Sequence, residues 1–202
     1  MNIDRHHRLV RNLHWVTFLA LIFGYSLIWW RDGMDDTGER RLALAWHATV
    51  GLTVLAFAIA RLVSRAFGDK LVVPHPLSRI ERIGSTSSHV LLYVAMIGIP
   101  LLGWLTVSAR GRLPDILGLV TLPALIAKDR DLADSLQQWH YLAAMAMLAV
   151  IGVHVCGALY HHFIKRDNVL RAMLPVAADL MLSKLPRRRP EPVQIRPQLP
   201  VE

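Results

Sequence analysis

The sequence predicts an all-α integral membrane protein built as a bundle of four transmembrane helices. Hydrophobic residues make up 53% of the 202-residue chain, and its mean hydropathy is +0.36. These residues gather into four long runs, each close to the roughly 20 residues that a helix needs to cross about 30 Å of hydrocarbon. Charged stretches separate the runs, which is typical of a membrane protein.

The four hydrophobic runs define the expected spans. They cover residues 13–30, 43–63, 89–108 and 139–163. The first run follows basic residues, as the hydrophobic part of a signal peptide does, but it ends at Trp29 and Trp30 without a small-residue cleavage site. Tryptophan is enriched at membrane interfaces. We therefore interpret the first run as a retained span.

Basic residues outnumber acidic ones, 23 Lys and Arg against 15 Asp and Glu, for a formal charge of +8. Because they flank the hydrophobic runs, we interpret them as signals of membrane orientation and expect no nucleic-acid partner. The N-terminus, the segment between the second and third spans (with Arg61) and the C-terminal tail carry 16 of the 23, and the other two loops carry 7. Positive charge stays inside the cell, so both termini are expected in the cytoplasm.

Two regions follow from this pattern. Residues 1–175 form the predicted four-helix transmembrane domain. Residues 176–202 are rich in Arg and Pro and are expected to form a disordered cytoplasmic tail.

Histidines are the ionisable residues that stand out in the expected spans, because no Asp or Glu lies in any of the four. Ionisable side chains inside a membrane are costly and mark functional sites by default, although a single histidine is equally well explained by a hydrogen bond to a neighbouring helix. Several histidines at two depths favour a functional site. They are His14, His47, His89, His140, His154, His161 and His162.

Four of these histidines fall into two pairs by depth. His47 and His140 begin the second and fourth spans, near the outer face, and His14 begins the first span on the inner side. His154 follows His140 by 14 residues, which is roughly 21 Å along a helix and about 40° short of four full turns. Both therefore share one helix face. We expect His14 to meet His154 and His47 to meet His140.

Haem iron suits two imidazoles that face each other across an apolar gap. Zinc and proton relays favour carboxylate or thiolate groups, whereas the spans hold no carboxylate and the chain has a single cysteine, Cys156. The chain has no CxxCH attachment motif, so any haem is bound non-covalently. We therefore predict two b-type haems at two depths, through which electrons cross the membrane.

Short motifs around the histidines follow the order and spacing of a known family. They are Leu13-His14-Trp15, Trp46-His47 with Arg61-Leu62, Ser88-His89-Val90-Leu91-Leu92-Tyr93 with Pro100 and Gly103, Gln138-Trp139-His140, Ile151-Gly152-Val153-His154, and His161-His162-Phe163-Ile164-Lys165-Arg166-Asp167-Asn168. Over most of Arg8 to Pro175 the chain resembles the bacterial cytochrome b561 family, which includes a superoxide:ubiquinone oxidoreductase.

The resemblance implies a four-helix bundle in the bacterial inner membrane with two bis-histidine haems. It makes His14 and His154 the axial iron ligands of an inner haem b, and His47 and His140 those of an outer haem b. It also implies an oxidoreductase that oxidises superoxide at the periplasmic face and reduces ubiquinone.

Two alternatives remain open. One is a haem-bearing electron-transfer anchor for a partner redox protein such as a dehydrogenase. The other is a histidine-lined metal transporter, which the lack of carboxylates in the spans disfavours.

Two further histidines and one arginine lie near the predicted inner haem. His89 begins the third span at the depth of His14 and His154, so it either replaces one of these ligands or lines a quinone site. His161 follows His154 by 7 residues, within about 20° of the same helix face, and is a second quinone-site candidate. Arg61 is either a partner for a haem propionate or an orientation anchor that reaches toward the membrane surface.

The long loop before the fourth span contains both basic and acidic residues. The basic ones are candidates for steering an anionic substrate, and the acidic ones oppose that role. They are Arg110, Arg112, Lys128 and Arg130 on the basic side, and Asp115, Asp129, Asp131 and Asp134 on the acidic side.

Overall fold

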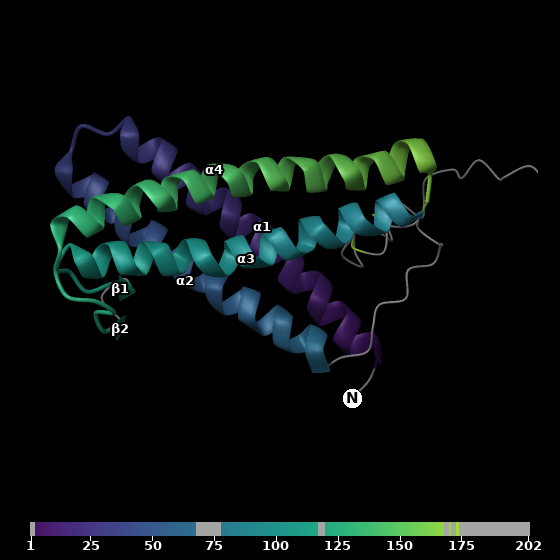
Figure 1. Ribbon diagram of the computed structural model, residues 1–202, viewed down its shortest axis with the longest axis horizontal. Helices are drawn as coiled ribbons and strands as arrows, with labels where there is room; N and C mark the ends of the chain where they lie inside the picture. The colour runs from purple at the N-terminus through teal and green to yellow at the C-terminus, as the bar shows by residue number, and fades with distance from the viewer. Residues whose placement is uncertain (1–2, 68–77, 117–119, 168–169, 171–172, 174–202) are drawn as a thin grey trace, which may run out of the picture.

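The computed structural model describes residues 3–67, 78–116, 120–167, 170 and 173 (Figure 1). The expected tail, residues 176–202, lies outside the described residues. In chain order the elements are α1 (Ile3–Asp32), α2 (Thr37–Phe67), α3 (Arg79–Ala109), β1 (Asp115–Ile116), β2 (Val120–Thr121), α4 (Arg130–Tyr160) and a π-helical turn, η1 (His161–Lys165). The four long helices are apolar enough to cross a membrane, so the predicted four-helix membrane fold is confirmed.

α3 and α4 begin at side-chain caps that lie well before their hydrophobic runs. The Ser78 hydroxyl accepts the backbone N–H of Glu81, and the Glu81 carboxylate accepts the N–H of Ser78 at 3.0 Å. This reciprocal arrangement satisfies donors at the helix start. At the start of α4 the Asp129 carboxylate accepts the N–H of Leu132 at 3.0 Å. Both helices therefore continue beyond the part that meets hydrocarbon.

The histidines expected at the outer face lie deeper in their helices than their places in the hydrophobic runs suggest. His47 is the eleventh residue of α2 and His140 the eleventh residue of α4, so each lies about 15 Å along the axis from the helix start. The reason is that a hydrophobic run marks only the lipid-facing part of a helix. We call the end of the bundle with the α1–α2 and α3–α4 connections the outer end, and the opposite end the inner end.

The helices form two pairs, and the pairs contact each other mainly through α2 and α3. α1 packs along α2, α3 packs along α4, and α2 also packs along α3. In Figure 1, α3 and α4 run side by side, whereas α1 and α2 cross them at an angle. The backbones of α1 and α4 hardly approach each other. Side chains bridge this gap, among them Tyr25, whose hydroxyl donates to the Ala144 carbonyl at 2.6 Å.

A small apolar core holds the middle of the bundle together, while the outside is hydrophobic. The outer surface exposes large side chains such as Leu19, Val94 and Val153, as expected where lipid replaces water. The buried core residues are Val54, Ala58, Met96, Ile99 and Met147.

The described parts of the connection between α3 and α4 pack at the outer end. Its strands β1 and β2 pair antiparallel, and β1 packs against α2. The Trp104 indole N–H donates to the Pro123 carbonyl at 3.0 Å, and the Leu125 N–H donates to the Ser108 hydroxyl at 3.1 Å. These bonds fix the loop against the end of α3.

Candidate haem sites

His47 and His140 face each other from α2 and α4 and form the outer pair. Their ring centres are 6.1 Å apart and their planes are inclined by 76°. The Nδ1 of His47 donates to the Gly24 carbonyl on α1, and the Nδ1 of His140 donates to the Ile99 carbonyl on α3, both at 3.0 Å. Because a carbonyl only accepts, each neutral ring carries its proton on Nδ1. The Nε2 lone pair of each ring is therefore available to a metal.

The spacing of the outer pair fits a metal atom between the rings. Two opposed imidazole nitrogens, each roughly 2.0–2.1 Å from a metal, place the ring centres about 6 Å apart. The Nδ1 hydrogen bonds hold both rings in orientation, as partners of metal-binding histidines do. Two neutral nitrogen donors in an apolar gap suit haem iron. The outer pair therefore fits a b-type haem.

An apolar cavity adjoins the outer pair, with walls from all four helices. Apart from the two histidines and the Tyr25 hydroxyl the walls are apolar, which suits a flat hydrophobic macrocycle. The lining residues are Ala20, Leu21, Gly24, Tyr25, His47, Val50, Gly51, Val54, Ala95, Met96, Ile99, Pro100, His140, Ala144 and Met147.

His14, His89 and His154 meet toward the inner end and form the inner cluster. The ring centres of His14 and His154 are 6.3 Å apart, whereas those of His89 and His154 are only 5.1 Å apart. The first spacing matches that of the outer pair, and the second is about 1 Å short of what a shared metal atom requires. The Nδ1 of His89 donates to the Ser85 carbonyl on its own helix at 2.7 Å. The geometry thus favours His14 over His89 as the partner of His154.

A buried methionine separates the outer pair from the inner cluster. Met147 lies 7 residues after His140 and 7 residues before His154, so all three side chains lie on one face of α4. Met147 is 4% exposed and packs in the apolar core with Val54 and Met96. Each histidine of α4 is therefore about 10 Å along the helix from this apolar layer.

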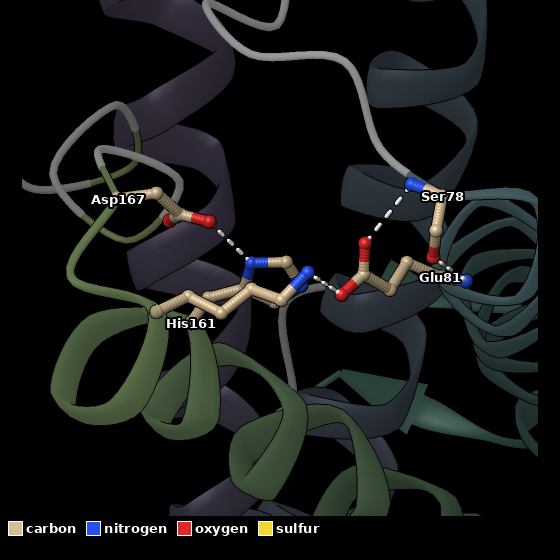
Figure 2. Close-up of polar contacts among 5 residues, drawn as sticks. Ser78, Glu81, His161 and Asp167 are labelled. Carbon is tan, nitrogen blue, oxygen red and sulfur yellow. Dashed lines mark hydrogen bonds and ion pairs between the residues drawn. The ribbon is translucent and has the colours of Figure 1, made fainter.

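His161 lies apart from the inner cluster and pairs with a carboxylate. Its Nδ1 is 2.5 Å from the Asp167 carboxylate, and each side chain is only 13% exposed. Figure 2 shows the His161 ring directed at the Asp167 carboxylate. The Glu81 carboxylate forms an ion pair with Lys165 of η1. The Tyr160 ring lies beside the His161 ring, with ring centres 6.0 Å apart.

Sequence reasoning identified His161 but missed its carboxylate partner, Asp167. Asp167 follows His161 by 6 residues, a spacing that does not bring side chains together on an α-helix. The chain instead forms the π-helical turn, and Arg166 then adopts a left-handed conformation with φ 55°, which returns Asp167 to the His161 ring. Such turns occur often at functional sites.

Gly103 makes room for the His140 ring, which yields a testable prediction. A Cβ at Gly103 would lie 3.2 Å from Cε1 and 3.4 Å from Nδ1 of His140, whereas one at Gly98 on the same helix would meet nothing within 4 Å. Gly103→Val should push the ring from its bond to Ile99 and weaken outer haem binding roughly 10–100-fold, the usual cost of losing an orienting partner. The haem-to-protein ratio checks this, with Gly98→Ala as the control. Normal outer haem content in Gly103→Val would contradict it.

Comparison with known proteins agrees with these features. The family model described as prokaryotic cytochrome b561 matches residues 5–176. The chain is similar to the probable superoxide oxidase CybB of Yersinia pestis, with 29% identity over 164 residues that cover 81% of this chain and 92% of that protein. It is also similar to cytochrome b561 homologs 1 and 2 of Escherichia coli K12, each 26% identical over 165 residues. These alignments cover 81% and 80% of this chain and 93% and 86% of the two proteins.

Proposed function

The chain belongs to the prokaryotic cytochrome b561 family, and from this premise we propose that it is a two-haem superoxide:ubiquinone oxidoreductase. Family membership makes it a b-type haem protein that transfers electrons across a membrane. In the proposed reaction, two superoxide anions each lose one electron and become dioxygen. One ubiquinone takes up these two electrons and two protons and becomes ubiquinol.

Two histidine pairs, one on each side of Met147, carry the proposal. In each pair the distance between the ring centres suits a metal atom between the rings. We assign His47 and His140 to an outer haem and His14 and His154 to an inner haem, from ring-centre distances of 6.1 and 6.3 Å. Bound haem iron takes up and releases one electron at a time. The residues of the chain fix the imidazoles, exclude water with apolar walls and hold the two sites at two depths.

Basic side chains at the outer end support an anionic electron donor. Gly111 adopts a φ of 71°, and the side chain of Lys128 lies directly against it. This turn brings Lys128 close to Arg110 and Arg112, and all three side chains are exposed. An exposed basic cluster raises the local concentration and arrival rate of a small anion such as superoxide. The similarity to a probable superoxide oxidase supports the same donor.

We propose that ubiquinone is reduced at the inner end, where the chain has two histidines, His89 and His161, in addition to the proposed ligands His14 and His154. Quinone carbonyls need hydrogen-bond donors, and reduction to the quinol needs two protons. Histidine provides both near neutral pH. Of the 23 Lys and Arg residues, 16 lie on the side of the two termini and 7 in the other two loops. This supports a bacterial inner-membrane orientation in which the inner end and both termini face the cytoplasm. The protons then come from the cytoplasm.

Sealed vesicles of known sidedness test the donor, the acceptor and the orientation together. Superoxide generated outside right-side-out vesicles should reduce the haems and form ubiquinol, whereas inverted vesicles should respond far less, because an anion enters hydrocarbon at high cost. The rate should fall as the ionic strength rises from about 0.01 to 0.15 M, since the Debye length shortens from about 30 to 8 Å. Superoxide dismutase should abolish the signal.

Two results would overturn parts of this proposal. A response confined to inverted vesicles would reverse the orientation. Failure of superoxide to reduce the haems in either preparation would leave the electron-transfer anchor for a partner redox protein as the better interpretation.

A further inference from the structure

Arg61 of α2 carries a buried donor beside the inner cluster. Its Nε is inaccessible to solvent and has no hydrogen-bond partner among the described residues. The guanidinium carbon lies 5.6 Å from the centre of the Tyr93 ring on α3, close enough for a cation–π contact. Arg61 is also within electrostatic range of the inner-cluster histidines His14, His89 and His154.

An orientation anchor requires a different arrangement. An arginine that only marks the membrane surface keeps its head group in water or among lipid head groups. The Nε of Arg61 is instead buried in protein. This burial costs free energy unless the N–H donor is hydrogen-bonded and the charge is paired. The ion pairs seen in the described part of the chain are Arg31–Asp32, His161–Asp167 and Lys165–Glu81, and none involves Arg61. An anion is therefore expected here.

We propose that Arg61 binds a carboxylate and that this carboxylate is a propionate of the inner haem. The inference rests on the proposed function, because it needs a haem between His14 and His154. A guanidinium offers a planar fork of donors that matches a carboxylate, and Tyr93 fixes the plane of that fork. The same fixed positive charge stabilises an added electron nearby and so favours electron flow from the outer to the inner site. Arg61 is thus a positioning residue for the cofactor and a determinant of its reduction potential.

Redox titration of the purified full-length protein, followed by haem spectra, tests the proposal. In Arg61→Gln the reduction equilibrium of the inner haem should shift about tenfold toward the oxidised form, or 59 mV for a one-electron couple, while the outer haem stays unchanged. Arg61→Lys should keep most of the wild-type potential. Arg65→Gln is the matched control, because this exposed arginine lies one turn further along α2 and its charge is screened.

Each outcome decides for or against the proposal. Arg61→Gln with full haem content and an unchanged inner potential would overturn it, and so would an equal shift in Arg65→Gln. If Arg61→Gln loses the inner haem, retention of that haem in Arg61→Lys supports a charge partner. Loss in both variants indicates a packing role and overturns the proposal.

A second comparison separates a propionate from a lipid phosphate as the bound anion. The difference between wild type and Arg61→Gln should persist in detergent stripped of phospholipid. A difference that disappears there and returns with anionic phospholipid would overturn the propionate assignment. If wild-type protein binds one haem and His140→Ala binds none, the chain has no inner haem. That result would refute the proposed function, and it is distinct from any result on Arg61.

Discussion

Purified His140→Ala is expected to retain only the inner haem, so that its haem content falls from two per chain to one. The His140 ring is held by the Ile99 carbonyl at 3.0 Å and faces His47 at 6.1 Å between ring centres. Alanine removes one of the two proposed iron ligands together with this orienting bond, so the outer haem should bind much more weakly and be lost during purification. His47→Ala should have the same effect, and His154→Ala should spare the outer haem instead.

The haem-to-protein ratio and the optical spectrum of the reduced protein measure this result. Extraction with acidic acetone should release all haem from wild type, because no thioether bond holds it. A full complement of two haems in His140→Ala would refute the ligand assignment.

His14→Ala and His89→Ala distinguish the two candidate partners of His154. The ring centre of His14 lies 6.3 Å from that of His154, and that of His89 lies 5.1 Å away. We expect His14→Ala to lose the inner haem and His89→Ala to keep it, since only the longer spacing admits a metal between the rings. The opposite result would make His89 the ligand and would remove His14 from the ligand pair.

The four-helix fold was predictable because lipid leaves the backbone few options. Every peptide group within the membrane must be hydrogen-bonded internally, so each long apolar run has to be a helix. The meeting of His140 with His47 and of His154 with His14 was predictable for a similar reason. A 14-residue separation on a regular helix keeps two side chains on one face, and four spans of similar length bring residues of similar depth together.

Features that depend on side-chain surroundings or on irregular backbone could not be read from the pattern. The hydrophobic runs do not show where Asp129 starts α4, so the depth of His140 within its helix was not evident. Arg61 had two interpretations until its buried Nε and the nearby Tyr93 ring favoured one of them. The contact of His161 with Asp167 requires a π-helical turn, for which sequence periodicity carries no signal.

His161→Gln is expected to slow ubiquinone reduction roughly 10²–10⁴-fold, the usual contribution of a general acid or base. Asp167 accepts from Nδ1 of His161 and thereby holds the ring in one orientation. The protonated ring then has Nε2–H to donate to a quinone carbonyl.

Asp167→Asn should slow the same step less strongly, because the imidazole remains and loses only part of what holds its orientation. His162→Gln is the matched control, since the neighbouring His162 ring packs on Phe163 with ring centres 4.8 Å apart. Stopped-flow spectra with a soluble quinone separate the steps. Haem content and the reduction of the outer haem by superoxide should be unchanged in all three variants, and only reoxidation by quinone should slow.

The double variant His89→Ala with His161→Ala gives the sharpest result. If the quinone site lies at the inner end, this protein should keep two haems that superoxide reduces at the wild-type rate, yet release electrons to quinone slowly. Rapid quinone-dependent turnover would remove both histidines from the quinone site. In that case the Lys165–Glu81 ion pair, which links η1 to α3, would remain as a structural contact, and the quinone site would have to be sought elsewhere.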